Sequence, residues 1–461
     1  MDYALRIKGA DVFINGHLQK KELVIKDGKI VKIEKQQSER ICDEKILDCS
    51  GMIIIPGTID PHVHLRDPGH RERETFFTGT MAAAAGGVTT IIEHPISVPP
   101  PYNKCIFENR IDSAKPQAIV DYCFVGALGT KSIGCAKELK DCGAVAYKTF
   151  LHDAMPGREA EFEGLTISDD YHLLKALETV KLLDMTAMFH AENNSIISGK
   201  INELREAGYL QPIAHYLSRP IIAEVETVSK LILFAKETGA RIEICHVSSS
   251  ETMELLKKAK EENISIIVET CPHYLFKTEE ECISMGAMAK CNPPIRKREN
   301  VEKMWQYVQD GTVDIIGSDH GPFTYEQKIK GQSNIFEAPS GMPGLETRLP
   351  IMMDSVLRGK LLLEKMVQLL CENPAKIFGI DDRKGYITEG MDADLVVLNT
   401  NKTTTVDKNK MYTKSKDTAD LFDGMILKGY LEMTIVRGKI VMKNGMVDKA
   451  LAGYGMYIKR R

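Results

Sequence analysis

Two histidines separated by a single residue, His62 and His64, follow an apolar run in the segment GTIDPHVHLRDPG, residues 57–69. On an extended chain, residues two apart point to the same side, so both imidazoles can approach one ligand. Two imidazoles at the end of a buried strand form a clamp for a metal ion such as zinc. The alternative is that the pair occurs by chance in a loop, and the spacing alone does not decide between the two.

Lys148 lies inside the apolar segment AVAYKTFL, residues 144–151. Burying an ammonium group in a strand is costly unless its charge is lost or compensated. A neutral buried lysine can react with carbon dioxide to give a carbamate, an anion able to bridge two cations. The segment alone favours the simpler explanation, in which the lysine pairs with a core carboxylate or extends from the strand end.

Three further polar side chains occupy the same kind of position. His190 and His246 each follow an apolar run, and Asp319 lies in a Gly-Ser-Asp-His-Gly turn after another. Taken singly, each has an ordinary explanation, as a hydrogen-bonded core histidine or a carboxylate that caps a helix. Together with the residues above, they place candidate ligands at five strand ends. That co-occurrence indicates a binuclear metal site.

The elements between these positions must bring the strand ends together. Short apolar runs, as expected of strands buried on both faces, fall at about 52–59, 88–93, 121–128, 144–151, 184–190, 240–247, 264–270 and 312–317. Most are separated by segments able to form helices, at 75–87, 169–183, 221–238, 251–262 and 299–309. Eight parallel strands with intervening helices describe an α/β fold, the (β/α)8 TIM-type barrel, whose functional residues gather at the strand ends. An open doubly wound sheet is the rival, but it predicts no such gathering.

Both ends of the chain have a different pattern, without the alternation of strands and helices. Residues 4–50 contain short β segments with hairpin signals at Asn15-Gly16 and Asp27-Gly28. Short β segments of the same kind occur again at 393–399 and 431–447. We therefore predict a smaller, β-rich and sandwich-like domain formed by both termini, from residues 1–55 and 385–461, with the barrel at 56–384.

The composition excludes several classes of protein. The 461 residues carry a net charge of -4, so there is no basic excess to bind nucleic acid. No apolar run approaches the roughly 20 residues needed to cross a membrane, and no secretory signal opens the chain. Eleven cysteines are scattered without CxxC pairs, which indicates reduced thiols and a cytoplasmic protein.

The chain resembles the amidohydrolase superfamily, and within it the cyclic amidohydrolases: hydantoinases, allantoinases, dihydropyrimidinases and dihydroorotases. The motifs that carry the resemblance are DPHVHLRDPG (60–69), GGVTTIIEHP (86–95), YKTF (147–150), FHAEN (189–193), CHVSS (245–249), ETCPHYL (269–275), AKCNPPIR (289–296), GSDHGPF (317–323) and GMPGLETRLP (341–350). The resemblance implies two divalent metal ions, zinc by default, held by His62, His64, Lys148, His190, His246 and Asp319. It also implies that Lys148 is carboxylated on its side-chain nitrogen (N6-carboxylation).

The activity that the resemblance implies is hydrolysis of a cyclic amide or ureide. A metal-bridging hydroxide would attack the ring carbonyl, with His62 and His64 on one ion and His190 and His246 on the other. Asp319 would take up the proton and pass it to the departing ring nitrogen.

The type of ring is indicated by departures within the motifs. Arg66 completes the HxHxR pattern with which dihydroorotases bind the substrate carboxylate, but Ile96 replaces an asparagine that those enzymes also use. Asp153 stands where dihydropyrimidinases have a tyrosine that supports the oxyanion, and Ser340 replaces an asparagine before the Gly-x-Pro-Gly turn. These departures favour a hydantoin- or allantoin-type five-membered ureide, with dihydroorotase and dihydropyrimidinase activity as alternatives.

Four residues are candidate substrate contacts: Arg66, Ser340, Cys271 and His273. For the last two a structural role is the alternative. The family implies a homodimer or homotetramer whose partner is a small-molecule cyclic ureide. A different class also stays open, because some relatives of dihydropyrimidinase are structural proteins that have lost the ligands. The six candidate ligands of this chain argue against such a role.

Overall fold

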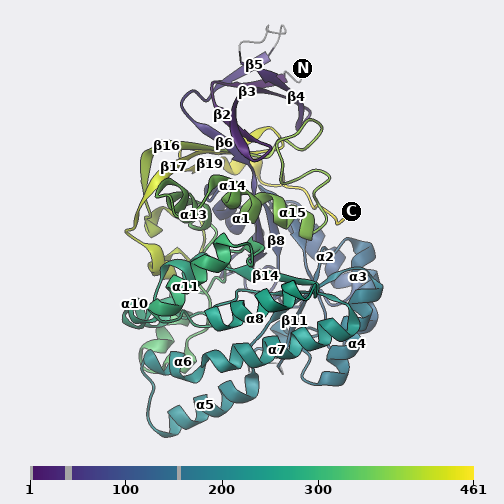
Figure 1. The fold of residues 1–461 in the computed structure, drawn as a ribbon, viewed down its shortest axis with the longest axis vertical. Coiled ribbons are helices and arrows are strands. Elements are labelled where there is room, and N and C mark those ends of the chain that lie inside the picture. Colours follow the sequence, from purple (N-terminus) through teal and green to yellow (C-terminus); the bar gives the residue numbers. More distant parts are fainter. Residues whose placement is uncertain (1–3, 37–43, 153–156) are drawn as a thin grey trace.

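The computed structural model describes residues 4–36, 44–152 and 157–461, and it places strands from both ends of the chain side by side (Figure 1). These strands are β1 (Ala4–Lys8), β2 (Asp11–Ile14), β3 (His17–Lys26), β4 (Lys29–Lys35), β5 (Glu44–Asp48), β6 (Ile53–Pro56), β16 (Leu395–Thr405), β17 (Ile426–Val436), β18 (Lys439–Lys443) and β19 (Met446–Val447). They form one ten-stranded sheet in the order β19-β18-β17-β16-β6-β2-β3-β1-β5, with β4 paired to β3. The predicted β-rich domain from both termini is confirmed, whereas its limits at residues 55 and 385 stay a prediction.

Two tight turns shape the N-terminal part of this sheet. β2 pairs with β3 around Asn15-Gly16, and β3 pairs with β4 around Asp27-Gly28. Asn15 and Asp27 have φ values of 51° and 52°, and the glycines that follow have 85° and 77°. Two-residue hairpins need positive φ at both central positions, which is why Asn-Gly and Asp-Gly recur there. Both hairpin predictions are confirmed.

Strand β3 allows the sheet to curl over on itself. Its first residues pair with β2, whereas its last residues pair with β1 and β4. An apolar cluster that includes Leu23, Ile54 and Leu395 fills the enclosed space. The domain therefore has a sandwich-like core although its strands belong to a single sheet.

The barrel consists of parallel strands that close into a ring. They are β7 (Thr58–Val63), β8 (Val88–Glu93), β9 (Asp121–Phe124), β10 (Gly126–Ala127), β11 (Tyr147–Phe150), β12 (Thr186–His190), β13 (Arg241–Ile244), β14 (Ile266–Thr270) and β15 (Ile315–Ile316). Only Val125 separates β9 from β10, so the two occupy one strand position. A parallel bridge between Val63 and His320 closes the ring, and the His64 amide donates to the His320 carbonyl at 2.9 Å. The (β/α)8 fold class is confirmed.

Helices follow the barrel strands and cover them (Figure 1). They are α1 (Phe76–Ala85), α2 (Lys104–Ala114), α3 (Ala136–Cys142), α4 (Asp170–Leu182), α5 (Asn194–Glu206), α6 (Ile213–Ser218), α7 (Ile221–Thr238), α8 (Ser250–Glu261), α9 (Pro272–Phe276), α10 (Glu279–Met285), α11 (Arg298–Gln309), α12 (Tyr325–Ile329), α13 (Arg348–Leu357), α14 (Leu363–Val367) and α15 (Asn373–Ile377). Side chains that cap first-turn N–H groups fix several starts, as Asp169 does for α4 and Ser249 for α8. The five predicted helices correspond to α1, α4, α7, α8 and α11. Within the described ranges, no helix has the length and apolar character needed to span a membrane.

The first predicted barrel strand, 52–59, is wrong in its position. Residues Ile53–Pro56 form β6, which pairs with β16 and β2 in the terminal sheet, and the barrel strand begins at Thr58. Two successive buried strands give one continuous apolar run, so hydrophobicity does not show the boundary between them. The shift carries His62 into the strand itself and places His64 just after it.

Apolar side chains fill the amino-terminal half of the barrel interior. Ile59, Ile92, Met188 and Ile267 belong to this cluster and come from four different strands, and Val145 joins them from just before β11. A barrel interior of this kind is a packed core and not a channel. Polar side chains are therefore gathered at the opposite, carboxyl ends of the strands.

Candidate metal centre

Six side chains of metal-binding types meet at the carboxyl ends of the barrel strands. They come from β7, β11 and β12 and from the turns after β7, β13 and β15, and they are His62, His64, Lys148, His190, His246 and Asp319. All six line one cavity of about 840 Å³. Residues up to 257 positions apart in the chain meet here because parallel strands end at the same rim of the barrel.

A carboxylate from another strand holds the His62 ring. Nδ1 of His62 lies 2.9 and 3.1 Å from the two carboxylate oxygens of Glu269 on β14. With both oxygens facing it, Nδ1 is best satisfied as the donor of this contact, which leaves Nε2 with its lone pair. Within the described residues this Nε2 makes no hydrogen bond, and it lies 3.4 Å from Oδ1 of Asp319. A carboxylate behind the far ring nitrogen is the usual support of a metal-binding histidine.

A second pair of histidines is arranged in the same way. Nδ1 of His190 lies 3.2 Å from Nε2 of His246, and Nε2 of His190 lies 2.9 Å from the Glu192 carboxylate. Arg219 binds that carboxylate as well. Glu192 thus keeps the proton on Nε2 of His190 and leaves Nδ1 with the lone pair that a cation can bind. Nitrogens at this separation can bind one ion, because a zinc–imidazole bond is about 2.0–2.1 Å long.

Lys148 is fully buried on β11, within the wall of the cavity. Its Nζ donates a hydrogen bond to Sγ of Cys245 at 2.9 Å. Sulfur is a weak acceptor, so this bond compensates little of the cost of burying an ammonium group. The carboxyl groups of Glu243 and Glu269 interact electrostatically with it from the barrel interior.

The donor set fits divalent cations. Burial lowers the pKa values of His62, His64 and His246 well below the usual range, so the imidazoles are neutral and keep a lone pair. In the described part of the chain, Nδ1 of His64 and Nδ1 of His246 have no hydrogen-bond partner, although buried polar atoms are nearly always paired. Burial also raises the pKa of Asp319 to about 8. A nearby cation would bind Nε2 of His62, which also has no hydrogen-bond partner among the described residues, and it would lower that pKa.

Two of the candidate ligands sit on unusual backbone. The φ values of His246 and Asp319 are 41° and 47°, and that of Arg66 in the same cavity is 59°. Residues other than glycine seldom adopt positive φ, and those that do concentrate at functional sites. The strand ends are thus bent so that these side chains face the cavity.

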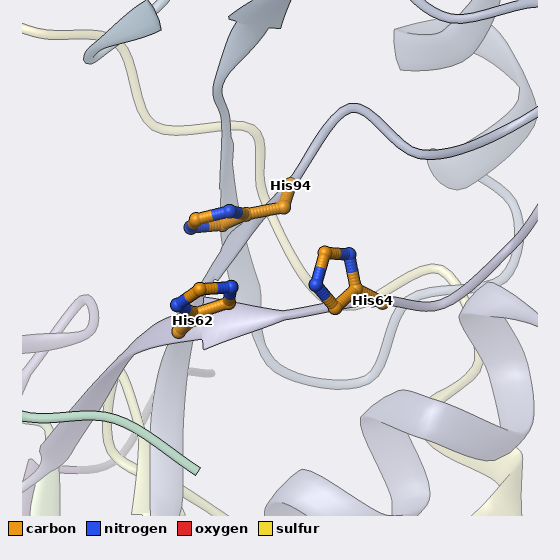
Figure 2. A group of neighbouring side chains, drawn as sticks. All are labelled: His62, His64 and His94. Atoms are coloured by element: carbon orange, nitrogen blue, oxygen red, sulfur yellow. The ribbon is translucent and has the colours of Figure 1, made fainter. Parts of the chain in front are cut away.

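His94 is a site residue that the sequence interpretation missed. Figure 2 shows its ring face to face with that of His62 and close to His64; the stacked rings are 3.8 Å apart between centroids. Nε2 of His94 donates to the Pro61 carbonyl at 3.1 Å, and Nδ1 has no partner among the described residues. Nitrogens of the three histidines lie within 4.8 Å of one another and can hold a metal ion. The sequence signal that could have identified His94 is its position directly after β8, which is a strand-end position like those of the predicted ligands.

Two predicted substrate contacts, Arg66 and Ser340, line the cavity. Arg66 is buried, its Nη1 lies 3.8 Å from Glu161, and its guanidinium faces the Phe323 ring. Burial lowers its pKa to about 9. Its Nε and Nη1 have no hydrogen-bond partner among the described residues. Such a group can receive an anionic part of a ligand.

The other two predicted contacts, Cys271 and His273, are not among the residues that line this cavity. Cys271 is fully buried, and its thiol lies 3.9 Å from the Glu269 carboxylate. His273 borders a separate small recess with Pro343 and Phe422. Both follow the end of β14 and enter α9, which turns them away from the rim. Their absence from the cavity lining favours the structural role that the sequence left open, and a substrate contact by either residue stays a prediction.

A model described as the amidohydrolase family matches residues 53–441 of the chain. Among curated proteins, an L-hydantoinase of Paenarthrobacter aurescens is 32% identical over 99% of this chain and 98% of its own length. An allantoinase of Bacillus licheniformis is 36% identical over 86% of this chain and 87% of its own.

Solved structures give the same result. The L-hydantoinase (dihydropyrimidinase) from Arthrobacter aurescens matches with a TM-score of 0.94 and 31% identity, covering 99% of this chain and 100% of its own. The dihydropyrimidinase from Brevibacillus agri matches with a TM-score of 0.90 and 27% identity, covering 99% and 98%.

Proposed function

The chain belongs to the amidohydrolase family, and from that premise we propose that it opens a five-membered cyclic ureide of the hydantoin or allantoin type. It is a hydrolase that acts on C–N bonds in cyclic amides. The observation that carries the proposal is the convergence of six metal-binding side chains on one cavity that also contains Arg66 and Ser340. A homo-oligomeric state and a cytoplasmic location stay predictions.

Two divalent cations, with zinc as the default, would be held by His62, His64, Lys148, His190, His246 and Asp319. When bound, the cations supply the Lewis acidity that activates water near neutral pH and polarises a carbonyl group. We propose that Lys148 is carboxylated, because its buried position in the same cavity as four candidate histidine ligands suits an anion better than an ammonium group.

Asp319 is the proposed general base and acid. Its carboxylate lies 3.4 Å from Nε2 of His62 and 3.6 Å from Nε2 of His64, at the bottom of the cavity that a ring can enter. There it can accept a proton from the attacking water and deliver it to the ring nitrogen that departs. Glu269 and Glu192 favour the tautomers of His62 and His190 that leave one nitrogen of each ring unprotonated.

The preference for a five-membered ring rests on the relatives and on two positions. The relatives are named L-hydantoinase and allantoinase, and Ser340 lines the cavity. Asp153, the other position, lies outside the described residues. Dihydroorotase activity is a second candidate, because Nε and Nη1 of Arg66, which make no hydrogen bond to the described residues, can bind a carboxylate on the ring. The side chain of Ile96, which also lines the cavity, offers that ring no hydrogen bond.

Metal analysis tests the cation site. Purified protein should contain about two divalent ions per chain, and a chelator should remove both the ions and the hydrolytic activity. Zinc, manganese or cobalt added back should restore activity. Protein that is well folded but holds no cation under any of these conditions would favour a non-catalytic structural relative over the enzyme.

A hydrolysis panel tests the substrate. Hydantoins, allantoin, dihydrouracil and dihydroorotate should be compared by kcat/KM, with the largest values expected for the five-membered rings. Turnover of dihydroorotate alone would reverse the ranking and assign Arg66 to its carboxylate. Replacing Arg66 by Met should then abolish turnover of the acidic ring, while leaving neutral hydantoins less affected.

A further inference from the structure

One wall of the cavity is an irregular segment, residues 335–341, which we call the 335–341 wall. It begins with a 3-10 turn at Ile335–Glu337, and both Phe336 and Ser340 face the cavity. Irregular segments are held in one conformation only if their backbone polar groups find partners. The partners of this wall are two lysines that the proposed chemistry does not use.

Lys290 is the first of these lysines. It is buried, it borders the cavity, and its Nζ donates hydrogen bonds to the carbonyls of Ile335 at 2.7 Å and Ala338 at 2.6 Å. Its own carbonyl accepts a hydrogen bond from the Gly341 amide at 2.9 Å. Lys290 thus ties both ends of the 335–341 wall to the segment after β14.

Lys328 is the second and lies on α12 with no exposed surface. Its Nζ donates to the carbonyls of Gly341 at 2.9 Å, Pro339 at 3.2 Å and Lys290 at 3.2 Å. An ammonium group has three N–H donors, so this side chain is fully satisfied by backbone oxygens. The carbonyls on either side of Ser340 are therefore turned away from the cavity and towards Lys328.

Both ammonium groups bind carbonyl oxygens, which are neutral acceptors. Burying a charge on neutral acceptors is costly, and burial lowers the pKa of Lys328 to about 7. An apolar side chain would fill the space at lower cost but would leave the carbonyls of the wall without donors. The presence of two costly buried lysines is therefore explained by the conformation that they impose on the 335–341 wall.

The wall is also held against the turn that carries Asp319. Gly341 has a φ of 147°, and a Cβ placed there would lie 2.5 Å from the Gly321 carbonyl oxygen. The Gly321 amide in turn donates to the Met342 carbonyl at 2.9 Å. A shift of the wall would change the width of the cavity between Ser340 and Asp319.

We propose that Lys290 and Lys328 are positioning residues that clamp the 335–341 wall and thereby set the affinity for the substrate ring. The inference rests on the proposed function for its substrate, a cyclic ureide. Neither lysine takes part in bond breaking, so loss of the clamp should act on binding and spare the cation site.

The direct test is Lys328→Met in the metal-loaded enzyme. We expect KM for the best ring of the panel to rise at least about tenfold while kcat changes less than about threefold, the pattern of lost substrate binding. The metal content should stay at the wild-type value. Lys330→Met is the matched control, because Lys330 is exposed two residues further along and should leave both constants unchanged. Lys328→Arg, which keeps a charged donor, should recover part of the lost affinity.

A second variant and a second readout cover a failure of Lys328→Met to fold. Lys290→Met removes two of the clamp bonds and leaves Lys328 in place, and it should also raise KM. Amide hydrogen exchange of the folded enzyme should be faster in a peptide covering 335–341 in both variants, and unchanged at α8. A KM that stays constant in these variants would refute the clamp. A rise in KM accompanied by a fall in both kcat and metal content would refute it as well. If no ring is hydrolysed by the wild type, the proposed function fails, whereas the exchange experiment still decides on the clamp.

Discussion

Lys148→Ala is expected to lose more than about a hundredfold in kcat/KM, because removing even an outer partner of a metal ligand costs about 10–100-fold. Lys148 is fully buried and lines the cavity beside the histidines. As a carbamate it would be shared by both cations, so its loss should lower the metal content as well as the rate. Steady-state kinetics and metal analysis of the same preparation measure both effects.

Rescue distinguishes the carbamate from a simple packing role. A short carboxylic acid can occupy the space that the shortened side chain leaves, and it should restore part of the activity of Lys148→Ala but not add to that of the wild type. Lys137→Ala is the control, since Lys137 is an exposed residue of α3. Full activity of Lys148→Ala without added acid would end the carbamate hypothesis.

Asp319→Asn is expected to reduce kcat by about 10²–10⁴-fold, the range for loss of a general acid–base group. The amide has nearly the same shape as the carboxyl group but neither accepts nor delivers a proton. Burial already raises the pKa of Asp319 to about 8, so a neutral side chain is tolerated there and the variant should fold. kcat and KM on the best ring, together with circular dichroism, provide the measurement.

The control for this substitution is Asp382→Asn, because Asp382 is exposed and follows the last of the six candidate ligands along the chain by many residues. It should leave kcat unchanged. Asp319→Asn with a rate within a fewfold of the wild type, and with its cations still bound, would show that another group handles the proton.

Much of the fold was predictable because the barrel strands are buried on both faces and give short apolar runs. The hairpins at Asn15-Gly16 and Asp27-Gly28 were predictable for a local reason, the positive φ that such turns need. The first barrel strand was misplaced, since β6 and β7 follow each other with only Gly57 between them. A boundary between two buried strands depends on which sheet each one joins, and that is a tertiary property.

The sequence by itself determined which side chains stand at the strand ends, and therefore the candidate ligands from His62 to Asp319. It did so because parallel strands of a barrel end at one rim, so residues at the ends of different strands lie close together in space. Only the tertiary structure decided the partners of these groups: Glu269 behind His62, His94 stacked upon it, and Lys328 beneath the cavity wall. Those contacts join different strands and loops, so they depend on ring closure and packing, which no local pattern of residues records.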